Sequence, residues 1–529
     1  MTQNSVLRKN RTYILSPESF SLFIFIVVGL FAAFHHSLWR DEMQGWLVAW
    51  KSDSWTSLWV NNAPSGHPVL WSALIYSVKG LTNTPLSMQL LHWLLGSLAL
   101  LVFWRWNPLP KWQKVIFTFG YFPFWEYYLI CRHYVLAELL IFLFCSFFHY
   151  RRKSYILSSV LIGLLFNTHA FSWSLGFAAC VVLCVEWFTD SQQRKTYKNQ
   201  KYWSFDLAIS LIILVSLALF AAFSLIQVKE SVDFISGPLD LRHAFRVLGR
   251  LFGGYFLIIP NSDQWLDLIL CSLIICGALV ITVSFLRRSN AALIFFLSGI
   301  TFLLLFNYNL YLGIGSRHYG YYYLILISSV WLSLHPEEQI NKINNKIFNI
   351  DISKVFNALL TFCLAIHFAA GVHRTLYDFY VPYSAGKETA NYIKEMGWSE
   401  QVMFGTRDVE VTTVSGYLDR DIFYPELNSF GSYAQWNKRK SVNRSETLTH
   451  IQSFFVKYPE TNRLLVILSK GSAFSEMRPG DKKSYGSLSI TADKKFERSW
   501  VNPERFYLYW VVNAGNDSVD VESIPRQNE

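Results

Sequence analysis

The sequence predicts a polytopic α-helical membrane protein that carries a small soluble α/β domain at its C-terminal end. Of the 529 residues, 52% are hydrophobic and only 16% are charged, whereas soluble domains carry about 25% charged residues. About eleven apolar segments fit the length of roughly 17 to 25 residues that crosses a bilayer. After the last of them, residues 377–529 have the composition of an ordinary soluble domain.

The basic residues indicate how the chain is oriented. A net charge of +10 could suggest nucleic-acid binding, but these residues gather in short loops between apolar segments, as the positive-inside rule describes. Arg8, Lys9 and Arg11 precede the first segment, so the N-terminus is expected in the cytoplasm, and no nucleic-acid partner is expected. The first segment starts after Pro17 without a small-residue cleavage site and is interpreted as a signal anchor.

The apolar segments are interpreted in order as about eleven transmembrane helices. The first two lie at about 20–36 and 86–104, and the next two on either side of the turn at 125–134. Residues 155–187 form two helices broken at 167–169, and another helix covers about 207–227. The last four are a helix that ends at 287–288, one that ends near 307–309, one that starts just after 318, and one at about 355–373. An odd number of spans places the C-terminal part on the outer side of the membrane.

Two loops are expected to contain helices that lie in the membrane interface. The first outer loop, 38–85, is rich in tryptophan, which favours headgroup depth. In the outer loop 229–263, Arg242, Arg246 and Arg250 recur every four residues and apolar residues fall on another face. This spacing is typical of an amphipathic helix.

The polar C-terminal part separates as a second domain. The segment KETANYIKEM predicts a helix, and QVMFG, RLLVIL, SLSIT and FYLYWVV predict strands. The sequence therefore divides into a transmembrane domain, 1–376, and an extracytoplasmic α/β domain, 377–529.

Ionisable residues collect on the outer side of this topology. A single arginine or histidine near a helix end can simply extend toward the headgroups. A whole set on one face, with paired carboxylates, suggests an extracytoplasmic site for an anionic ligand. The set consists of Arg40, Asp41, Glu42, His67, Glu126, Arg132, His133, His169, Arg317 and His318.

Asp41 is the candidate with the clearest chemistry. It lies beside Arg40 and Glu42, where the first apolar segment ends. A carboxylate within hydrogen-bond reach can take the proton of an attacking hydroxyl, and arginine can stabilise the charge on a leaving phosphate. The alternative is that Asp41 caps a helix. His67, in GHPVLW, has an equally plausible structural role at a helix start.

Four motifs together resemble a known family. WRDEMQGW, GHPVLWSALIY, CRHYVLAELL and SRHYGYYYLIL are similar to motifs of the GT-C superfamily of membrane glycosyltransferases. They are closest to the branch of protein O-mannosyltransferases and lipid A aminoarabinose transferases. The chain departs from the pattern at Val69, where a second proline is usual, and at His318, which separates Arg317 from Tyr319.

The resemblance implies roles for individual residues. Asp41 matches the catalytic base and Glu42 its acidic neighbour. Arg132 and Tyr134 match the helix-4 motif, and Arg317, with His318 beside it, matches the arginine that meets the donor phosphate. The neighbouring candidates for substrate binding are Arg40, His67, His133 and His169.

The expected function is transfer of a sugar, with inversion, from a polyprenyl-phosphate donor to an extracytoplasmic lipid, glycan or protein acceptor. The expected location is the inner (plasma) membrane of a bacterial cell, with membrane lipids as partners. No cofactor is firmly implied, although a divalent metal is possible. A polysaccharide ligase or polymerase, which the Arg242–Arg250 helix would suit, and a membrane transporter remain as alternatives. A transporter would place ionisable groups near the membrane midplane in repeated broken helices.

Overall fold

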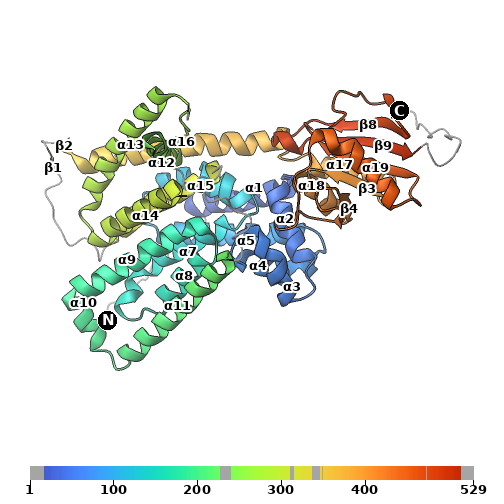
Figure 1. Cartoon of the computed structure of the whole chain (residues 1–529). Coiled ribbons are helices and arrows are strands. Elements are labelled where there is room, and N and C mark those ends of the chain that lie inside the picture. Colours follow the sequence, from blue (N-terminus) through green and yellow to red (C-terminus); the bar gives the residue numbers. More distant parts are fainter. Residues whose placement is uncertain are drawn as a thin grey trace, which may run out of the picture.

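The computed structural model describes residues 17–226, 240–261, 263–309, 315–335, 346–347, 350–471 and 473–513. It consists of a helical bundle and a smaller domain built on a β-sheet, which lies at one end of the bundle (Figure 1). The expected polytopic helical membrane protein with an added α/β domain is confirmed.

Seven helices in the described residues are long and apolar enough to cross a membrane, and an eighth span is present if one bent pair is counted. The seven are α5 (Leu86–Trp106), α7 (Tyr134–Phe147, continued by a 3-10 turn), α9 (Trp173–Thr189), α11 (Trp203–Ile226), α13 (Trp265–Leu286), α14 (Asn290–Asn309) and α16 (Ile352–Tyr380). The bent pair is α1 (Pro17–His35) and α2 (Arg40–Trp50), which meet at 83°.

Fewer than eleven helices in the described residues are long and apolar enough to cross a membrane. The remaining expected spans are helical but shorter or more polar. They are α6 (Lys111–Thr118) with the π-helix η3 (Tyr121–Leu129), α8 (Ile156–Phe166) and α15 (Ser316–Ser333). Short basic α10 (Ser191–Lys198) lies at the end of the bundle away from the β-sheet domain (Figure 1).

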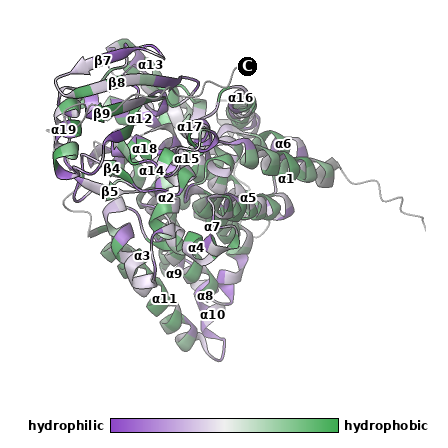
Figure 2. Ribbon diagram, turned by 90° about the vertical axis from the view of Figure 1, so that its right-hand side faces the viewer, coloured by the Kyte–Doolittle hydropathy of each residue, from purple (hydrophilic) through white to green (hydrophobic). Residues whose placement is uncertain are grey.

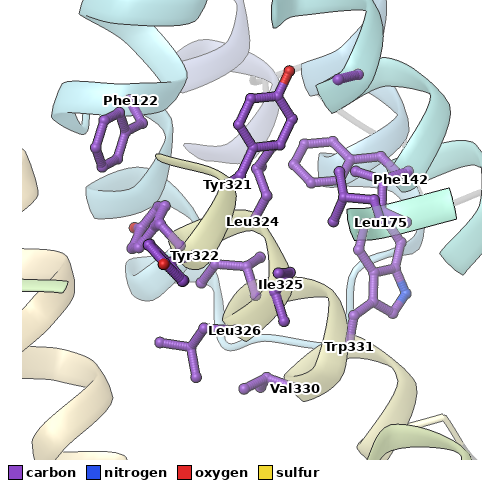
Figure 3. Packing of buried hydrophobic residues seen from close by; sticks show 14 of the residues in the cluster. Phe122, Phe142, Leu175, Tyr321, Tyr322, Leu324, Ile325, Leu326, Val330 and Trp331 are labelled. Atoms are coloured by element: carbon purple, nitrogen blue, oxygen red, sulfur yellow. The ribbon is translucent and has the colours of Figure 1, made fainter. Parts of the chain in front are cut away.

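The centre of the bundle is α15. Its tyrosines and leucines and its Trp331 are almost completely buried, and they pack against Phe122, Phe142 and Leu175 from other elements (Figure 3). A helix that is buried on all sides is fixed by its neighbours. The N-terminal end of α15, which carries Arg317 and His318, therefore has a rigid support.

The two loops expected to contain helices do so. In the first outer loop, α3 (Trp55–Asn62) begins where Ser54 accepts a hydrogen bond from the Ser57 N–H, and α4 (Leu70–Val78) follows. The arginine-rich segment forms α12 (Leu241–Phe256). The C-terminal half of α12 is buried, and a Cβ on Gly254 would lie 2.7 Å from the Tyr319 carbonyl oxygen. The helix thus packs into the bundle rather than lying wholly in the interface.

The C-terminal domain is a mixed sheet of seven strands flanked by helices. The strand order is β5-β4-β3-β6-β9-β8-β7, with β3 parallel to both of its neighbours and the other pairs antiparallel. The strands are β3 (Met403–Thr406), β4 (Ile422–Tyr424), β5 (Ser429–Gly431), β6 (Arg463–Ser469), β7 (Lys482–Tyr485), β8 (Leu488–Phe496) and β9 (Phe506–Asn513). The helices are α17 (Gly386–Glu395), α18 (Asp408–Leu418) and α19 (Thr447–Lys457).

All four expected strands and the expected helix α17 are present in this domain. The short strands β4, β5 and β7 and the helices α18 and α19 were not predicted. Figure 2 shows the strongest hydrophobic colouring on bundle helices and paler or hydrophilic colouring over much of the sheet, as the change in sequence composition at residue 377 indicates.

The β-sheet domain packs directly on α2. The Leu38 N–H donates to the Tyr417 hydroxyl at 2.8 Å. The Gln44 side-chain amide exchanges two hydrogen bonds with the Ala434 backbone, at 2.9 and 3.1 Å. Since Gln44 is one helical turn from Asp41, this contact brings the C-terminal domain next to the candidate catalytic residue.

Candidate functional site

The bend between α1 and α2 creates the position of Asp41. The backbone is extended at Trp39, with φ −98° and ψ 176°, and α2 begins at the next residue. The Glu42 carboxylate accepts the Trp39 N–H at 3.0 Å. This capping contact satisfies one free N–H at the helix start. As α2 turns by 83° from the axis of α1, Asp41 lies outside the α1 span.

Asp41 is held between two guanidinium groups that come from distant segments. Its Oδ2 lies 2.9 Å from Arg132 Nη1 and 3.0 Å from Arg317 Nη2, and its Oδ1 lies 3.9 Å from Arg40 Nε. Burial by itself raises the pKa of a carboxyl group, but the charges of Arg132, Arg317 and Arg40 hold the pKa of Asp41 below its ordinary value. Asp41 is therefore ionised and able to accept a proton.

Both arginines are fixed by backbone contacts. Arg132 precedes α7, and its backbone N and O atoms lie 3.2 and 3.1 Å from the Nε2 of His92. The Arg317 carbonyl accepts the Tyr127 hydroxyl at 2.8 Å. The Arg317 guanidinium also lies over the Trp39 ring, 4.8 Å from its centroid. These contacts pre-organise the two cations toward the same point.

Asp41 faces a pocket of about 790 Å³, including its open mouth. The pocket is lined by residues from α2, the loop before α4, the start of α7 and the C-terminal domain. These are Arg40, Asp41, Gln44, Gly45, Val48, Asn62, Ser65, His67, Pro68, Trp71, Ser72, Arg132, His133, Val409 and Trp436. Asp41 is the one carboxylate among these lining residues.

Arg40 connects the pocket to the C-terminal domain. Its Nη1 lies 2.7 Å from Glu410 Oε1 in α18, and its backbone N–H donates to Glu504 Oε1 at 3.1 Å. Burial raises the pKa of Glu504 to about 8, so this carboxyl group is largely protonated at neutral pH. The side chain of Arg40 is thus shared between the pocket and the domain interface.

Glu42, expected as a second catalytic carboxylate, does not line the pocket. It is completely buried. Its Oε1 accepts the Cys131 N–H at 2.5 Å, and its Oε2 lies 3.1 Å from His36 Nε2. The physical reason is the helical turn: adjacent residues of α2 point in different directions, so Asp41 reaches the pocket and Glu42 does not.

Three of the expected histidines form a cluster next to Arg132. The ring centroids of His67, His133 and His169 are 4.4 to 5.0 Å apart. Burial, together with the nearby charge of Arg132, lowers the pKa of His67 to about 3, and burial also lowers the pKa values of His133 and His169. These imidazoles are neutral, which is the form that binds metals.

Two further candidates complete this cluster. His318 Nε2 lies 3.2 Å from the Tyr134 hydroxyl, and the His318 and His169 rings stack with centroids 5.5 Å apart. Neither Tyr134 nor His318 is among the residues that line the pocket. They lie behind it, next to the imidazoles and Arg317.

Several site residues could not be found from the sequence. Gln44, Val409, Glu410 and Trp436 line the pocket or fix Arg40. Three of these come from the C-terminal domain, which has no recognisable motif. Gln44 lies within the WRDEMQGW motif, and that position was the one available signal.

Comparisons with known proteins give weak structural likenesses. No family model and no curated protein matches the sequence. The crystal structure of ArnT from Cupriavidus metallidurans bound to undecaprenyl phosphate is similar over 93% of this chain and 97% of that chain, with 11% identity and a TM-score of 0.49. A structure of the arabinofuranosyltransferase AftD from Mycobacteria is similar over 94% of this chain, with 12% identity and a TM-score of 0.33.

This chain spans 42% of the AftD chain. At these TM-scores neither likeness decides a function. The function is therefore inferred from the geometry of the site and from the sequence motifs.

Proposed function

We propose that this protein is a membrane glycosyltransferase of the GT-C type that uses a polyprenyl-phosphate-linked sugar on the outer side of the inner membrane. The observation that carries the proposal is the pocket carboxylate Asp41, held by Arg132 and Arg317 at 2.9 and 3.0 Å. Sugar transfer from a phosphate needs both components: a base for the acceptor hydroxyl and fixed positive charge for the leaving phosphate.

The proposed reaction is a direct displacement. The acceptor oxygen attacks the anomeric carbon, the bond between that carbon and the phosphate oxygen breaks, and the hydroxyl proton passes to Asp41. The electron pair of the broken bond stays on the polyprenyl phosphate, next to Arg132 and Arg317. Asp41 is the one carboxylate in the pocket lining. Retention would need a second carboxylate that acts as the nucleophile, so inversion at the anomeric carbon is expected.

The two arginines also connect base strength to donor binding. In the absence of an anion they lower the pKa of Asp41 and make it a weak base. A phosphate that shares their N–H groups offsets their charge, and the proton affinity of Asp41 rises with it. Each guanidinium has five N–H donors, so it can contact the carboxylate and a phosphate together. Asp41 is thus expected to become an effective base only when a donor is bound.

The orientation supports a lipid-linked donor. Nucleotide sugars are made in the cytoplasm, and the proposed topology places this pocket outside. A polyprenyl phosphate can present its headgroup at this depth while the prenyl chain stays in the bilayer. Trp436 and Val409 line the pocket from the soluble domain, which supports an acceptor that approaches from the extracytoplasmic side.

The alternative functions have less support from the pocket. The arginines of α12, which would suit a ligase or polymerase, do not line it: Arg250 Nη1 donates to the Asn307 carbonyl at 3.2 Å, and Arg246 lies 3.9 Å from Asp263. A transporter would need ionisable groups along a path through the membrane, whereas the ion pairs of Asp41 gather at one end of the bundle.

The experiment compares purified wild-type protein with Asp41→Asn and with the surface control Asp53→Asn. Each is offered polyprenyl-phosphate sugars or nucleotide sugars together with an envelope extract as acceptor. We expect transfer from the lipid-linked donor only, a loss on the order of 10²- to 10⁴-fold in Asp41→Asn, and no loss in the control. Efficient transfer from a nucleotide sugar, or normal turnover by Asp41→Asn, would contradict the proposal.

A further inference from the structure

Three imidazoles from three separate segments meet beside the pocket. His67 lies in the loop before α4, His133 is the N-cap residue of α7, and His169 is the N-cap residue of the 3-10 turn before α9. One ring nitrogen from each lies within 4.8 Å of the others. We propose that these three histidines bind one divalent transition-metal ion of the zinc class.

The chemistry of the ligand set selects the ion. Three imidazole nitrogens suit zinc and related transition metals, whereas magnesium and calcium prefer oxygen ligands. Three protein ligands also leave the fourth position of a tetrahedral ion free, as in zinc sites that bind a further ligand. His67 and His133 line the pocket, so an ion can enter from the pocket, and its free position would be accessible from there.

The hydrogen bonding of the rings leaves nitrogens available. His67 Nδ1 and His133 Nε2 are buried and, in the described part of the chain, have no hydrogen-bond partner. Buried polar atoms without a partner are costly and need a physical explanation. A metal bound by these rings provides this explanation. A nitrogen that coordinates the metal no longer needs a hydrogen-bond partner, and the ring proton then lies on the other nitrogen.

His169 has one competing contact. Its Nδ1 accepts the Phe171 N–H at 3.2 Å. Coordination through Nδ1 displaces this contact directly. Coordination through Nε2 moves the ring proton to Nδ1 and displaces it as well. Metal binding therefore displaces this long hydrogen bond, and coordination by His67 through Nδ1 also displaces the 3.5 Å contact between His67 Nε2 and Arg132 Nη2.

The three ring nitrogens must move closer together to bind one ion. With zinc–nitrogen bonds of about 2.0–2.1 Å, tetrahedral ligands lie roughly 3.4 Å apart, which is less than the 4.8 Å limit of the cluster. We expect rotations of the three side chains to bring the nitrogens together. The side chains already lie close together, since the His133 and His169 rings stack at 4.4 Å with an angle of 13° between them.

The positive charge of Arg132 affects how tightly a metal ion can bind. Arg132 Nη2 lies 3.5 Å from His67 Nε2, and its charge opposes a second cation, although Asp41 partly offsets it. An anion at the free coordination position would remove this opposition. This consequence rests on the proposed function: a donor phosphate would contact both the ion and Arg132, so inorganic phosphate is expected to tighten metal binding.

The test measures metal binding by the full chain, purified without a polyhistidine tag and stripped with a chelator. Equilibrium dialysis against Zn²⁺ is performed on the wild type, His67→Ala, His133→Gln, His169→Ala, the triple variant, and His450→Ala as a surface-histidine control. We expect one tightly bound ion in the wild type and the control. Each single variant should lose affinity on the order of 100-fold. Co²⁺ in the wild type should give the visible absorption of a tetrahedral site.

Size-exclusion profiles identify variants that misfold, and His67→Ala, at the rim of the pocket, is the substitution that disturbs packing least. The proposal is overturned if the wild type binds no more zinc than the triple variant, or if well-folded single variants bind as tightly as the wild type. Because dialysis requires no donor sugar, zinc binding without any transferase activity would contradict the proposed function and leave the metal site standing.

Discussion

The adjacent carboxylates Asp41 and Glu42 are expected to fail in different ways when substituted, and Glu42→Gln is the sharper test. Glu42 is completely buried and lies 3.1 Å from His36, whose other ring nitrogen lies 2.9 Å from Asp378. Burial alone lowers the pKa of His36, but Glu42 and Asp378 together raise it to about 10. The imidazole is therefore charged, and Glu42 is half of a buried ion pair.

The magnitude follows from these contacts. Removing one partner of a buried ion pair costs about 3–5 kcal/mol because a charge is left without compensation. Asp378 still contacts His36, and the glutamine oxygen can still accept one of the backbone N–H bonds that Glu42 accepts from Trp39 and Cys131. We therefore expect a loss of about 3 kcal/mol, the lower end of that range.

The assay follows thermal unfolding of the purified protein in detergent and, separately, sugar transfer per folded molecule. Glu42→Gln should unfold several degrees earlier but retain transfer, because Glu42 does not line the pocket. Asp41→Asn should show the opposite behaviour. If Glu42→Gln kept the stability of the wild type but lost transfer, Glu42 would be a catalytic residue, and the structural interpretation would be wrong.

Three other predictions address the cations, the domain interface and the orientation. Arg132→Lys and Arg317→Lys should each weaken donor binding and reduce transfer about tenfold or more, since an ammonium cannot reproduce the planar fork of a guanidinium; unchanged donor affinity in both would make their charge a surface feature. Glu504 has a pKa raised by burial to about 8, above the unfolded value of about 4.3, so its contribution to stability is lost as pH rises through about 8. The melting temperature between pH 6 and pH 9 should therefore fall less in Glu504→Gln than in the wild type, and equal falls would refute this assignment. A reporter that fluoresces only in the cytoplasm, fused after Trp510, should stay dark, and a bright signal would place the pocket on the wrong side for the proposed donor.

Much of the fold was predictable because it depends on local composition. Apolar length identified helices at every expected span, and alternating β-branched and aromatic residues identified β3, β6, β8 and β9. Sequence pattern did not reveal β4, β5 and β7, because strands of only three or four residues show little periodicity. These strands are stabilised by pairing with their neighbours. The helix at 241–256 was predicted, but its burial against α15 was not, since the close approach of Gly254 to Tyr319 depends on tertiary packing.

In the candidate site, too, some features follow from the sequence and others only from the tertiary structure. The sequence by itself predicted that Asp41, Arg132, Arg317 and the histidines lie at helix ends or in loops, and the positive-inside pattern predicts that all of them lie on one side of the membrane. Only the tertiary structure decided that Asp41 faces the pocket while Glu42 is buried, because the direction of α2 depends on its bend from α1 and its packing on α18. The same packing brings Trp436 to the pocket and Glu410 to Arg40, each across more than 360 positions of sequence. Chemical identity and membrane side are local properties of a sequence, whereas the direction in which a side chain points is set by contacts between segments far apart in the chain.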